Sequence, residues 1–187
     1  MKWLIASDIH GSAYYCEKLL QRFYREKAER LLLLGDILYH GPRNALPEQY
    51  DPPRVAEMLN GLYGSVVSVR GNCEAEVDQM MLRFPVMADY ALLDWGQVFV
   101  FATHGHLYHE KKLPPLKQGD ILLHGHTHVP DCRFHGEPSD DSYYIYMNPG
   151  SVSIPKEGSY HGYMSYEDGH FQWKDFDGEL RWEYRVP

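Results

Sequence analysis

Residues able to bind metal ions recur in this sequence directly after short apolar runs. Carboxylate, amide and imidazole side chains are common ligands of divalent cations in proteins. Taken singly, Asp36 after Gly35 could shape a turn, and a lone histidine could be an ordinary polar residue. The residues that follow five of the runs are Asp8, His10, Asp36, Asn72, His104, His126 and His128. Independent turns give no reason for such a series, so the set predicts a metal site.

The spacing within this set also suits a shared metal centre. Asp8 and His10 are separated by one residue, as are His126 and His128. Alternate residues of an extended segment project to the same side and can reach a common point. Glycines stand beside the candidate ligands and allow sharp turns there; they are Gly11, Gly35, Gly71, Gly105 and Gly125.

The first half of the chain alternates apolar runs with segments of helical spacing. Residues 3–7, 30–34 and 65–69 are predicted strands. Ser12 is a predicted cap of the first helix, and Pro52 suits the start of the second. Strand and helix alternation predicts parallel strands joined by right-handed crossovers. In such sheets ligands bind beyond the carboxyl ends of the strands, which is where the candidate ligands stand.

The second half is rich in predicted strands. They cover residues 90–93, 98–103, 120–123, 143–147 and 163–166. A closing hairpin is predicted around Asp177-Gly178, between residues 171–176 and 180–186, and residues 136–142 form a predicted exposed loop. No linker or repeat divides the chain, so we expect one α/β domain over residues 1–187.

Composition narrows the class of protein. The 187 residues are 44% hydrophobic and 24% charged, a balance typical of a folded globular domain. The formal net charge of -8 argues against a stable nucleic-acid partner. The cysteines Cys16, Cys73 and Cys132 form no CxxC pair, which favours reduced thiols. The apolar run at the N-terminus is too short for a signal peptide and no stretch could span a bilayer, so we expect a cytoplasmic protein without a membrane partner.

The ordered set of motifs resembles the calcineurin-like metallophosphoesterase family. The motifs are Asp8-x-His10, Gly35-Asp36, Gly71-Asn72, His104 and Gly125-His126-Thr127-His128. The resemblance implies a four-layer α/β/β/α sandwich of two mixed sheets, with two divalent ions at its crest. It also implies the ligands of each ion. One ion is held by Asp8, His10, Asp36 and His128, and the other by Asp36, Asn72, His104 and His126.

Two ions suit the hydrolysis of phosphate esters. A bridging carboxylate, here Asp36, can fix two ions about 3.5 to 4 Å apart, so that one phosphate oxygen is clamped while a shared water becomes a hydroxide near neutral pH. The expected activity is that of a metal-dependent phosphodiesterase acting on a small phosphate ester. Manganese is the first choice for a site of carboxylates and imidazoles that exchanges water, and zinc, iron or nickel are alternatives.

Within the family, three segments resemble the short YfcE-like phosphodiesterases. They are residues 35–44, 70–74 and 148–151, and the resemblance covers residues 1 to about 156. It implies a homo-oligomer, either a dimer or a tetramer. The loop after Asp36 places Arg43 and Asn44 as candidate contacts of the substrate, although Arg43 could equally be a surface charge.

One position departs from the wider family. Many members carry a histidine after the metal-binding asparagine and use it to protonate the leaving group, whereas this chain has Cys73. A thiol with a pKa near 8.5 is a weaker acid-base partner. We therefore expect diesters with good leaving groups to react faster than alkyl monoesters. Cys73 is a candidate catalytic residue with Asp36 and Asn72, but a structural thiol is favoured over a nucleophilic one.

Other interpretations remain open at this stage. The same site could serve a phosphomonoesterase. The fold could instead carry a non-catalytic interaction scaffold, as in a retromer subunit, although all seven expected ligands are present. A nuclease is disfavoured by the acidic composition. His106 and His124 could orient the ligands through hydrogen bonds or could simply be packed.

Overall fold

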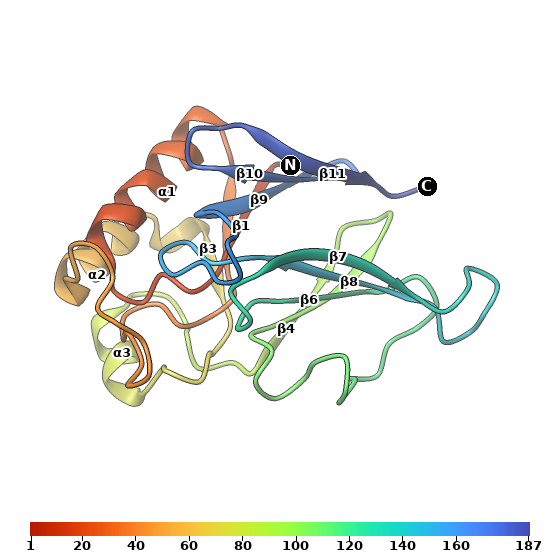
Figure 1. Cartoon of the computed structure of the whole chain (residues 1–187), viewed down its shortest axis with the longest axis horizontal. Helices are drawn as coiled ribbons and strands as arrows, with labels where there is room; N and C mark the ends of the chain where they lie inside the picture. The colour runs from red at the N-terminus through yellow and green to blue at the C-terminus, as the bar shows by residue number, and fades with distance from the viewer.

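Two mixed β-sheets form the framework of the molecule (Figure 1). The computed structural model describes residues 1–187. The first sheet has six strands in the order β11-β10-β9-β1-β2-β3, and the second has five in the order β4-β5-β6-β8-β7. The α/β fold with two mixed sheets, expected from the sequence, is therefore confirmed.

The N-terminal half supplies the parallel part of the first sheet. Its elements are β1 (Trp3–Ala6), α1 (Ala13–Arg25), β2 (Arg30–Leu33), α2 (Pro52–Asn60) and β3 (Val66–Ser68). The three strands pair in parallel, β1 with β2 and β2 with β3. The Oγ of Ser12 caps α1 by accepting the Tyr15 N–H at 3.3 Å, and Asp51 caps α2, which begins at Pro52. These elements agree with the sequence-based prediction.

The C-terminal strands complete the same sheet on its other side. They are β9 (Gly162–Glu167), β10 (His170–Asp175) and β11 (Leu180–Arg185). Strand β9 runs antiparallel beside β1, and β10 and β11 form the predicted closing hairpin. The beginning and the end of the chain therefore lie in one sheet, as the red and blue ends of the ribbon show in Figure 1.

The middle of the chain forms the second sheet. Its strands are β4 (Tyr90–Asp94), β5 (Phe99–Thr103), β6 (Ile121–His124), β7 (Pro130–His135) and β8 (Tyr144–Pro149). Strands β5, β6 and β8 are parallel, and β4 and β7 are antiparallel edges. Strand β7 was not predicted, and neither were the short helix α3 (Glu76–Met81) and the 3-10 turn η1 (Tyr63–Ser65).

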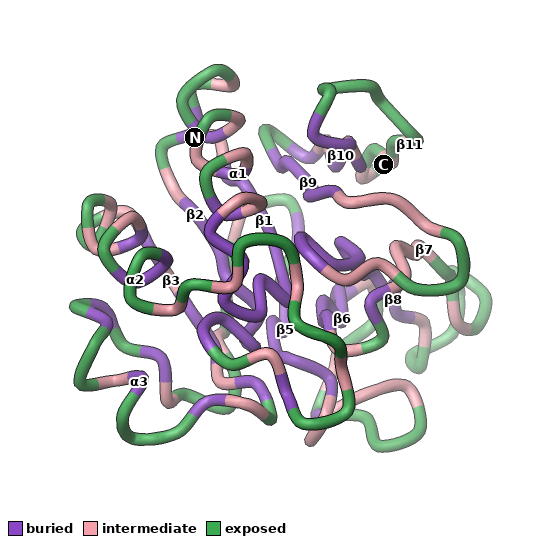
Figure 2. Tube along the Cα trace, turned by 60° about the vertical axis from the view of Figure 1, so that its left-hand side comes forward, coloured by how far each residue is buried: buried purple, intermediate pink, exposed green.

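Two cores lie on the two faces of the first sheet. Leu4 and Ala6 point toward α1 and α2, whereas Ile5 packs against the second sheet. This alternation follows from the period of two in a strand and explains why β1 is apolar throughout. Figure 2 shows the result, with β1, β2, β5 and β6 buried at the centre and exposed loops around them.

The outer face of the second sheet is covered by a loop and not by a helix. Phe101, Leu122 and Tyr146 form a small cluster there, and Tyr108 and Leu116 from the connection between β5 and β6 pack against it. The fourth layer implied by the resemblance is thus an irregular segment. The predicted loop at residues 136–142 is exposed. None of the helices has the length and hydropathy needed to cross a membrane.

Candidate metal centre

All seven candidate ligands lie at the carboxyl ends of five parallel strands. Asp8 and His10 follow β1, Asp36 follows β2, and Asn72 follows β3. From the second sheet, His104 follows β5, and the pair at positions 126 and 128 follows β6. The two sheets therefore meet at this end and bring together side chains that are up to 120 positions apart (128 − 8).

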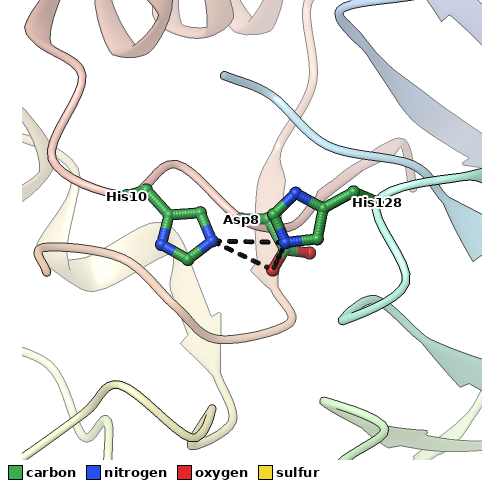
Figure 3. Close-up of side chains that lie close together, drawn as sticks. All are labelled: Asp8, His10 and His128. Atoms are coloured by element: carbon green, nitrogen blue, oxygen red, sulfur yellow. Dashed lines mark hydrogen bonds and ion pairs between the residues drawn. The ribbon is translucent and has the colours of Figure 1, made fainter. Parts of the chain in front are cut away.

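The first cluster gathers around the carboxylate of Asp8. Its Oδ1 lies 3.5 Å from the Nε2 of His10 and 3.3 Å from the Nε2 of His128. The two nitrogens are 3.4 Å apart, and all three groups point to a common centre in Figure 3. The Oδ2 of Asp36 closes the cluster at 3.7 Å from the Nε2 of His10.

The second cluster gathers around the Nε2 of His104. The Oδ1 of Asp36 lies 3.5 Å from this nitrogen, and the Oδ1 of Asn72 lies 3.1 Å from it. The Nδ1 of His126 is also 3.1 Å away. Asp36 thus directs one carboxylate oxygen at each cluster, the arrangement that a bridging ligand requires.

The backbone fixes the tautomers of three imidazoles. The Nδ1 atoms of His10, His104 and His128 lie 2.8, 2.6 and 2.6 Å from the carbonyl oxygens of residues 39, 34 and 154. Because a carbonyl oxygen only accepts, each neutral ring carries its hydrogen on Nδ1 and directs the lone pair of Nε2 inward. The buried Oδ1 of Asp8 has no hydrogen-bond donor. Lone pairs that converge on an unpartnered carboxylate suit a divalent cation.

The charges of the two clusters favour the binding of a cation. Burial lowers the pKa of His104, but its hydrogen bond to Asp36 and the charges of both carboxylates outweigh burial and raise that pKa to about 9. Burial also opposes ionisation of Asp36, yet the pKa of its carboxyl is lowered by His104. Burial lowers the pKa of His126 to about 4, which keeps that ring neutral at pH 7. Protons and metal ions therefore compete for the same negative centre.

Five of the seven residues have left-handed backbone conformations. The φ angles are 60° at Asp8, 50° at His10, 53° at Asp36, 67° at His126 and 64° at His128. This region is unfavourable for residues with a Cβ, and it persists where the surrounding structure imposes it. The backbone therefore turns sharply at the candidate ligands themselves. The neighbouring glycines alone do not explain these turns.

Two of the neighbouring glycines are needed for space. Gly71 and Gly125 have no positive φ. A Cβ on Gly71 would lie against the Oδ1 of Asp36, and one on Gly125 would lie against the side chain of Ser7 and the Oδ2 of Asp8. The absence of a side chain at both positions lets the loops approach the two carboxylates closely.

Glu74 is a site residue that sequence reasoning did not single out. Its buried carboxylate accepts the backbone N–H of Asp36 at 2.9 Å, that of Ile37 at 2.7 Å and that of Gly71 at 2.5 Å. Burial and the charge of Asp36 raise the pKa of Glu74 to about 7, although the three N–H groups oppose the shift. Glu74 therefore joins the loops after β2 and β3.

A further set of hydrogen bonds holds the loop of Asp8. The hydroxyls of Ser151 and Ser153 donate to the carbonyl oxygen of Asp8 at 3.0 and 3.2 Å. The Oδ2 of Asp8 accepts the backbone N–H of His126 at 3.1 Å. Asn148 donates to the carbonyl of Gly125 at 2.9 Å. The segment 148–153 thus holds the backbone of Asp8 and of Gly125.

The sequence over most of the chain matches one known family. The model of the calcineurin-like phosphoesterase superfamily domain matches residues 1–168. This chain belongs to that superfamily. It is 49% identical over 159 residues to the phosphodiesterase YfcE of Escherichia coli strain K12, which covers 85% of this chain and 83% of YfcE. A solved structure of YfcE, described as a phosphoesterase from E. coli, superimposes with a TM-score of 0.93 and 42% identity over 100% of both chains.

More distant structures share the fold alone. A predicted phosphoesterase from Streptococcus pneumoniae has a TM-score of 0.58 and 21% identity, over 98% of this chain and 97% of its own. Vps29 from Chaetomium thermophilum has a TM-score of 0.59 and 13% identity over 100% of both chains. The buried His and Asp clusters of this calcineurin-like phosphoesterase are typical of its superfamily and suit divalent metals.

In this phosphoesterase a polar pocket of about 460 Å³ opens over the clusters. Arg43 and Asn44, the candidate substrate contacts, line it together with Cys73. Asn44 is fixed by its side-chain N–H, which donates to the carbonyl of His40 at 2.9 Å. Lys156 also lines the pocket and was not predicted. Lys156 reaches the pocket because the chain folds back after residue 153. No local sequence pattern predicts this turn.

Cys73 is held beside Asp36. Its backbone N–H donates to the Oδ1 of Asp36 at 2.9 Å, and its Sγ lies 3.2 Å from the Nδ2 of Asn72. Burial and the nearby carboxylates raise the pKa of the Cys73 thiol, so the group is neutral at pH 7. A neutral thiol is a poor nucleophile, which agrees with the structural role favoured from the sequence.

The two neighbouring histidines differ in their surroundings. The ring of His124 is buried, lies 4.8 Å from the ring of Tyr146, and directs Nδ1 at the carbonyl of Gly125 at 2.9 Å. Burial lowers the pKa of His124 to about 4. His106 packs near His104, with ring centroids 5.4 Å apart. Neither ring is hydrogen-bonded to a candidate ligand side chain. This favours packing, and not orientation of the ligands, as the role of both histidines.

Proposed function

We propose that this calcineurin-like phosphoesterase hydrolyses phosphodiesters with the help of two divalent cations. One cation is held by Asp8, His10, Asp36 and His128, and the other by Asp36, Asn72, His104 and His126. The observation that carries the proposal is the carboxylate of Asp36, whose two oxygens face two separate clusters of lone pairs at 3.7 and 3.5 Å. Homology to the phosphodiesterase YfcE supports the same reaction.

The protein supplies positioning and electrostatics. When bound, two divalent cations lower the pKa of a water molecule and polarise a phosphoryl oxygen. Glu74 holds the backbone on both sides of Asp36, and backbone carbonyls orient three imidazoles. These contacts exist before substrate arrives, so little reorganisation is needed during the reaction.

The phosphate of the substrate is bound at the open side of the site. Arg43 and Lys156 are exposed and line the pocket above the clusters. In a chain with a net charge of -8, these cations provide local attraction for a phosphodiester monoanion. Asn44 lines the same pocket and offers its side-chain oxygen as a hydrogen-bond acceptor.

A preference for diesters with good leaving groups follows from Cys73. The thiol stands where an imidazole would protonate the departing oxygen, and a thiol is a weaker acid-base partner near pH 7. The leaving group must therefore depart with little assistance. Manganese is the proposed metal, because mixed carboxylate and imidazole ligands suit it.

We also propose that the chain forms a homo-oligomer. Large apolar side chains are exposed at the edges of the second sheet, with Leu92 on β4 and Phe134 on β7 each 53% exposed. Association of chains through an edge strand would bury them. Light scattering coupled to size-exclusion chromatography tests this proposal, and a molar mass equal to one chain would contradict it.

The proposed activity is tested by removing and restoring metal. The chain is treated with a chelator, and Mn²⁺, Zn²⁺, Fe²⁺ or Ni²⁺ is returned in separate samples. Each sample is assayed with bis(p-nitrophenyl) phosphate and with p-nitrophenyl phosphate. We expect turnover only with metal, fastest with Mn²⁺, and faster for the diester. No metal-dependent turnover of either compound would contradict the enzymatic function, and faster monoester cleavage would contradict only the diester preference.

A further inference from the structure

An apolar pocket adjoins the pocket above the metal clusters. It has a volume of about 250 Å³, and seven of its nine lining residues are hydrophobic. Leu38, Tyr39 and Tyr50 form one side, and Val77 and Met81 of α3 form the other. Cys73 lines both pockets, so the apolar pocket adjoins the pocket over the proposed cations at this residue.

The aromatic walls of this pocket are held in place. The ring of His40 lies beside those of Tyr39 and Tyr50, with centroids 4.7 and 5.2 Å apart and planes inclined by 67° and 80°. Edge-to-face contacts of this kind are favourable for aromatic rings. The two tyrosines are therefore oriented by a common neighbour, and the pocket exists without a ligand.

The apolar side chains around the pocket are unusually accessible. Val77 is 57% exposed, Tyr39 is 42% exposed and Met81 is 36% exposed. Asp78 is the one charged residue of the lining, and its carboxylate is buried and accepts the N–H of Ala75 at 2.6 Å. A contiguous apolar surface beside a polar site marks a place where an apolar group binds.

We propose that this pocket binds one arm of the phosphodiester substrate, and that this arm is a single aromatic ring or a short hydrocarbon chain. The proposal rests on the proposed phosphodiesterase function. An apolar cavity of about 150 Å³ accommodates benzene, so a pocket of this size holds one ring. A nucleobase fits poorly, because its polar edges would lose their hydrogen bonds to water without replacement.

Another hollow that borders the metal site is less suited to such an arm. It shares His126 with the metal-site pocket and has no hydrophobic residue among its nine lining residues, which include His109, Lys111 and Arg133. An apolar group placed there would remain beside charged groups and water. The position of an apolar arm is therefore on the side of Cys73, against α3.

Two matched variants on α3 test the proposal. Val77→Gln introduces a polar side chain into the pocket, whereas Met80→Gln changes a residue of the same helix that is 86% exposed and does not line the pocket. Glutamine favours helix in both, so the fold is retained. The substrates are phenyl p-nitrophenyl phosphate and methyl p-nitrophenyl phosphate, which share a leaving group and differ in the other arm. Each protein is assayed with Mn²⁺.

The wild-type chain should cleave the phenyl diester with a kcat/KM about tenfold above that of the methyl diester, mainly through a lower KM. Val77→Gln should reduce this ratio about fivefold, and Met80→Gln should leave it unchanged. If the nitrophenyl arm itself occupies the pocket, Val77→Gln lowers kcat/KM for both diesters, which also supports the proposal. Equal kcat/KM values for both diesters in the wild type and in both variants would overturn it.

A second copy of the chain is the competing occupant of this surface. Light scattering on the same samples distinguishes the two, because a loss of kcat/KM in Val77→Gln that accompanies a change of molar mass assigns the surface to an interface and overturns the proposal. Absence of Mn²⁺-dependent turnover of both diesters by the wild type would instead contradict the proposed function. Turnover without any effect of Val77→Gln contradicts the pocket alone.

Discussion

The carboxylate of Glu74 accepts the backbone N–H of Asp36 at 2.9 Å and lies in the buried space between two loops of the site. Gln would retain the shape but would direct an amide N–H at one of the backbone donors. We expect Glu74→Gln to weaken Mn²⁺ binding by about 10- to 100-fold, the usual effect of losing a group that orients a ligand. Calorimetric titration with Mn²⁺ measures this. The exposed neighbour Glu76, changed to Gln, is the control, and equal affinities in both variants would contradict the role of Glu74.

Replacement of Asp36 by Asn tests the bridging role. The amide is neutral and offers one oxygen in place of two, so both clusters lose the negative charge of Asp36 and one of them also loses an oxygen ligand. We expect kcat/KM for a diester to fall by at least about 1,000-fold and the Mn²⁺ stoichiometry to decrease. Circular dichroism checks that the variant is folded. A chain that acts only as a scaffold would bind metal weakly before the change, and unchanged titration curves would argue for that function.

Gly71→Ala should displace the carboxylate of Asp36 without changing any metal ligand. The added Cβ would lie against the Oδ1 of Asp36 and near the Oε2 of Glu74 at 2.7 Å. We expect a loss of ~1 to 3 kcal/mol in the free energy of unfolding and a severe loss of metal affinity. Gly64→Ala is the matched control, because a Cβ there meets no atom within 4 Å. Urea denaturation and metal titration of the two variants check the prediction, and similar results for both would contradict it.

Arg43→Ala should impair substrate binding and leave metal binding intact. The guanidinium lines the pocket over the clusters and is not among the candidate ligands. Loss of a charge-assisted hydrogen bond to phosphate should raise KM for a diester about tenfold. Arg54→Ala removes a charge that pairs with Glu57 on α2 and serves as the control. If KM is the same in both variants, Arg43 is a surface charge, which was the alternative left open by the sequence.

A partly buried charge network far from the site gives a prediction about pH. Glu26 accepts hydrogen bonds from Lys2 at 2.8 Å, from Lys174 at 2.9 Å and from the hydroxyl of Tyr163. Burial raises the pKa of Glu26, but these partners outweigh burial and lower it below its ordinary value. A lowered pKa stabilises the fold above the unfolded-state pKa of about 4.3, and this stability is lost as the pH falls through the folded-state pKa.

Glu26→Gln should therefore reduce the free energy of unfolding by ~2 kcal/mol at neutral pH. The difference from the wild type should shrink below a pH of about 4, where the carboxyl of Glu26 becomes protonated. Urea denaturation across this range measures both effects. Glu29, whose side chain is 61% exposed, is changed to Gln as the control. A difference that stays constant with pH would contradict the role of the charge.

The sequence predicted the strands and the site residues that depend on local patterns. Short apolar runs followed by Asp, Asn or His correspond to β1, β2, β3, β5 and β6, because a buried parallel strand must be apolar and its end must turn. The edge strand β7 was missed, since it begins at Pro130 and carries Asp131 and Arg133 in place of a regular alternation. The helix α3 has six residues and an N-cap residue, Ala75, whose side chain cannot accept a hydrogen bond, so neither its length nor its sequence indicated it.

The parts of the site that were missed depend on contacts between distant segments. Glu74 accepts hydrogen bonds from three backbone N–H groups. Every residue type except proline has such a group, so these contacts cannot be predicted from the sequence. Asp and His enter the left-handed region more readily than most residues, but at Asp8 and His126 the surrounding loops impose it, and the residue type alone does not predict it. Lys156 reaches the pocket because its N–H donates to the carbonyl of His128 at 3.2 Å, a contact across 28 positions (156 − 128).

The loops that carry the proposed ligands belong to both sheets, so the site lies across the seam between the two halves of the molecule. A pair of cations seated there would crosslink β1, β2 and β3 to β5 and β6 without any covalent bond. Separation of the halves and release of the metals then become a single cooperative event. Resistance to heat and to proteases should accordingly increase with the concentration of these metal ions in the cell. The lifetime of the protein would then depend on the same ions that its reaction requires.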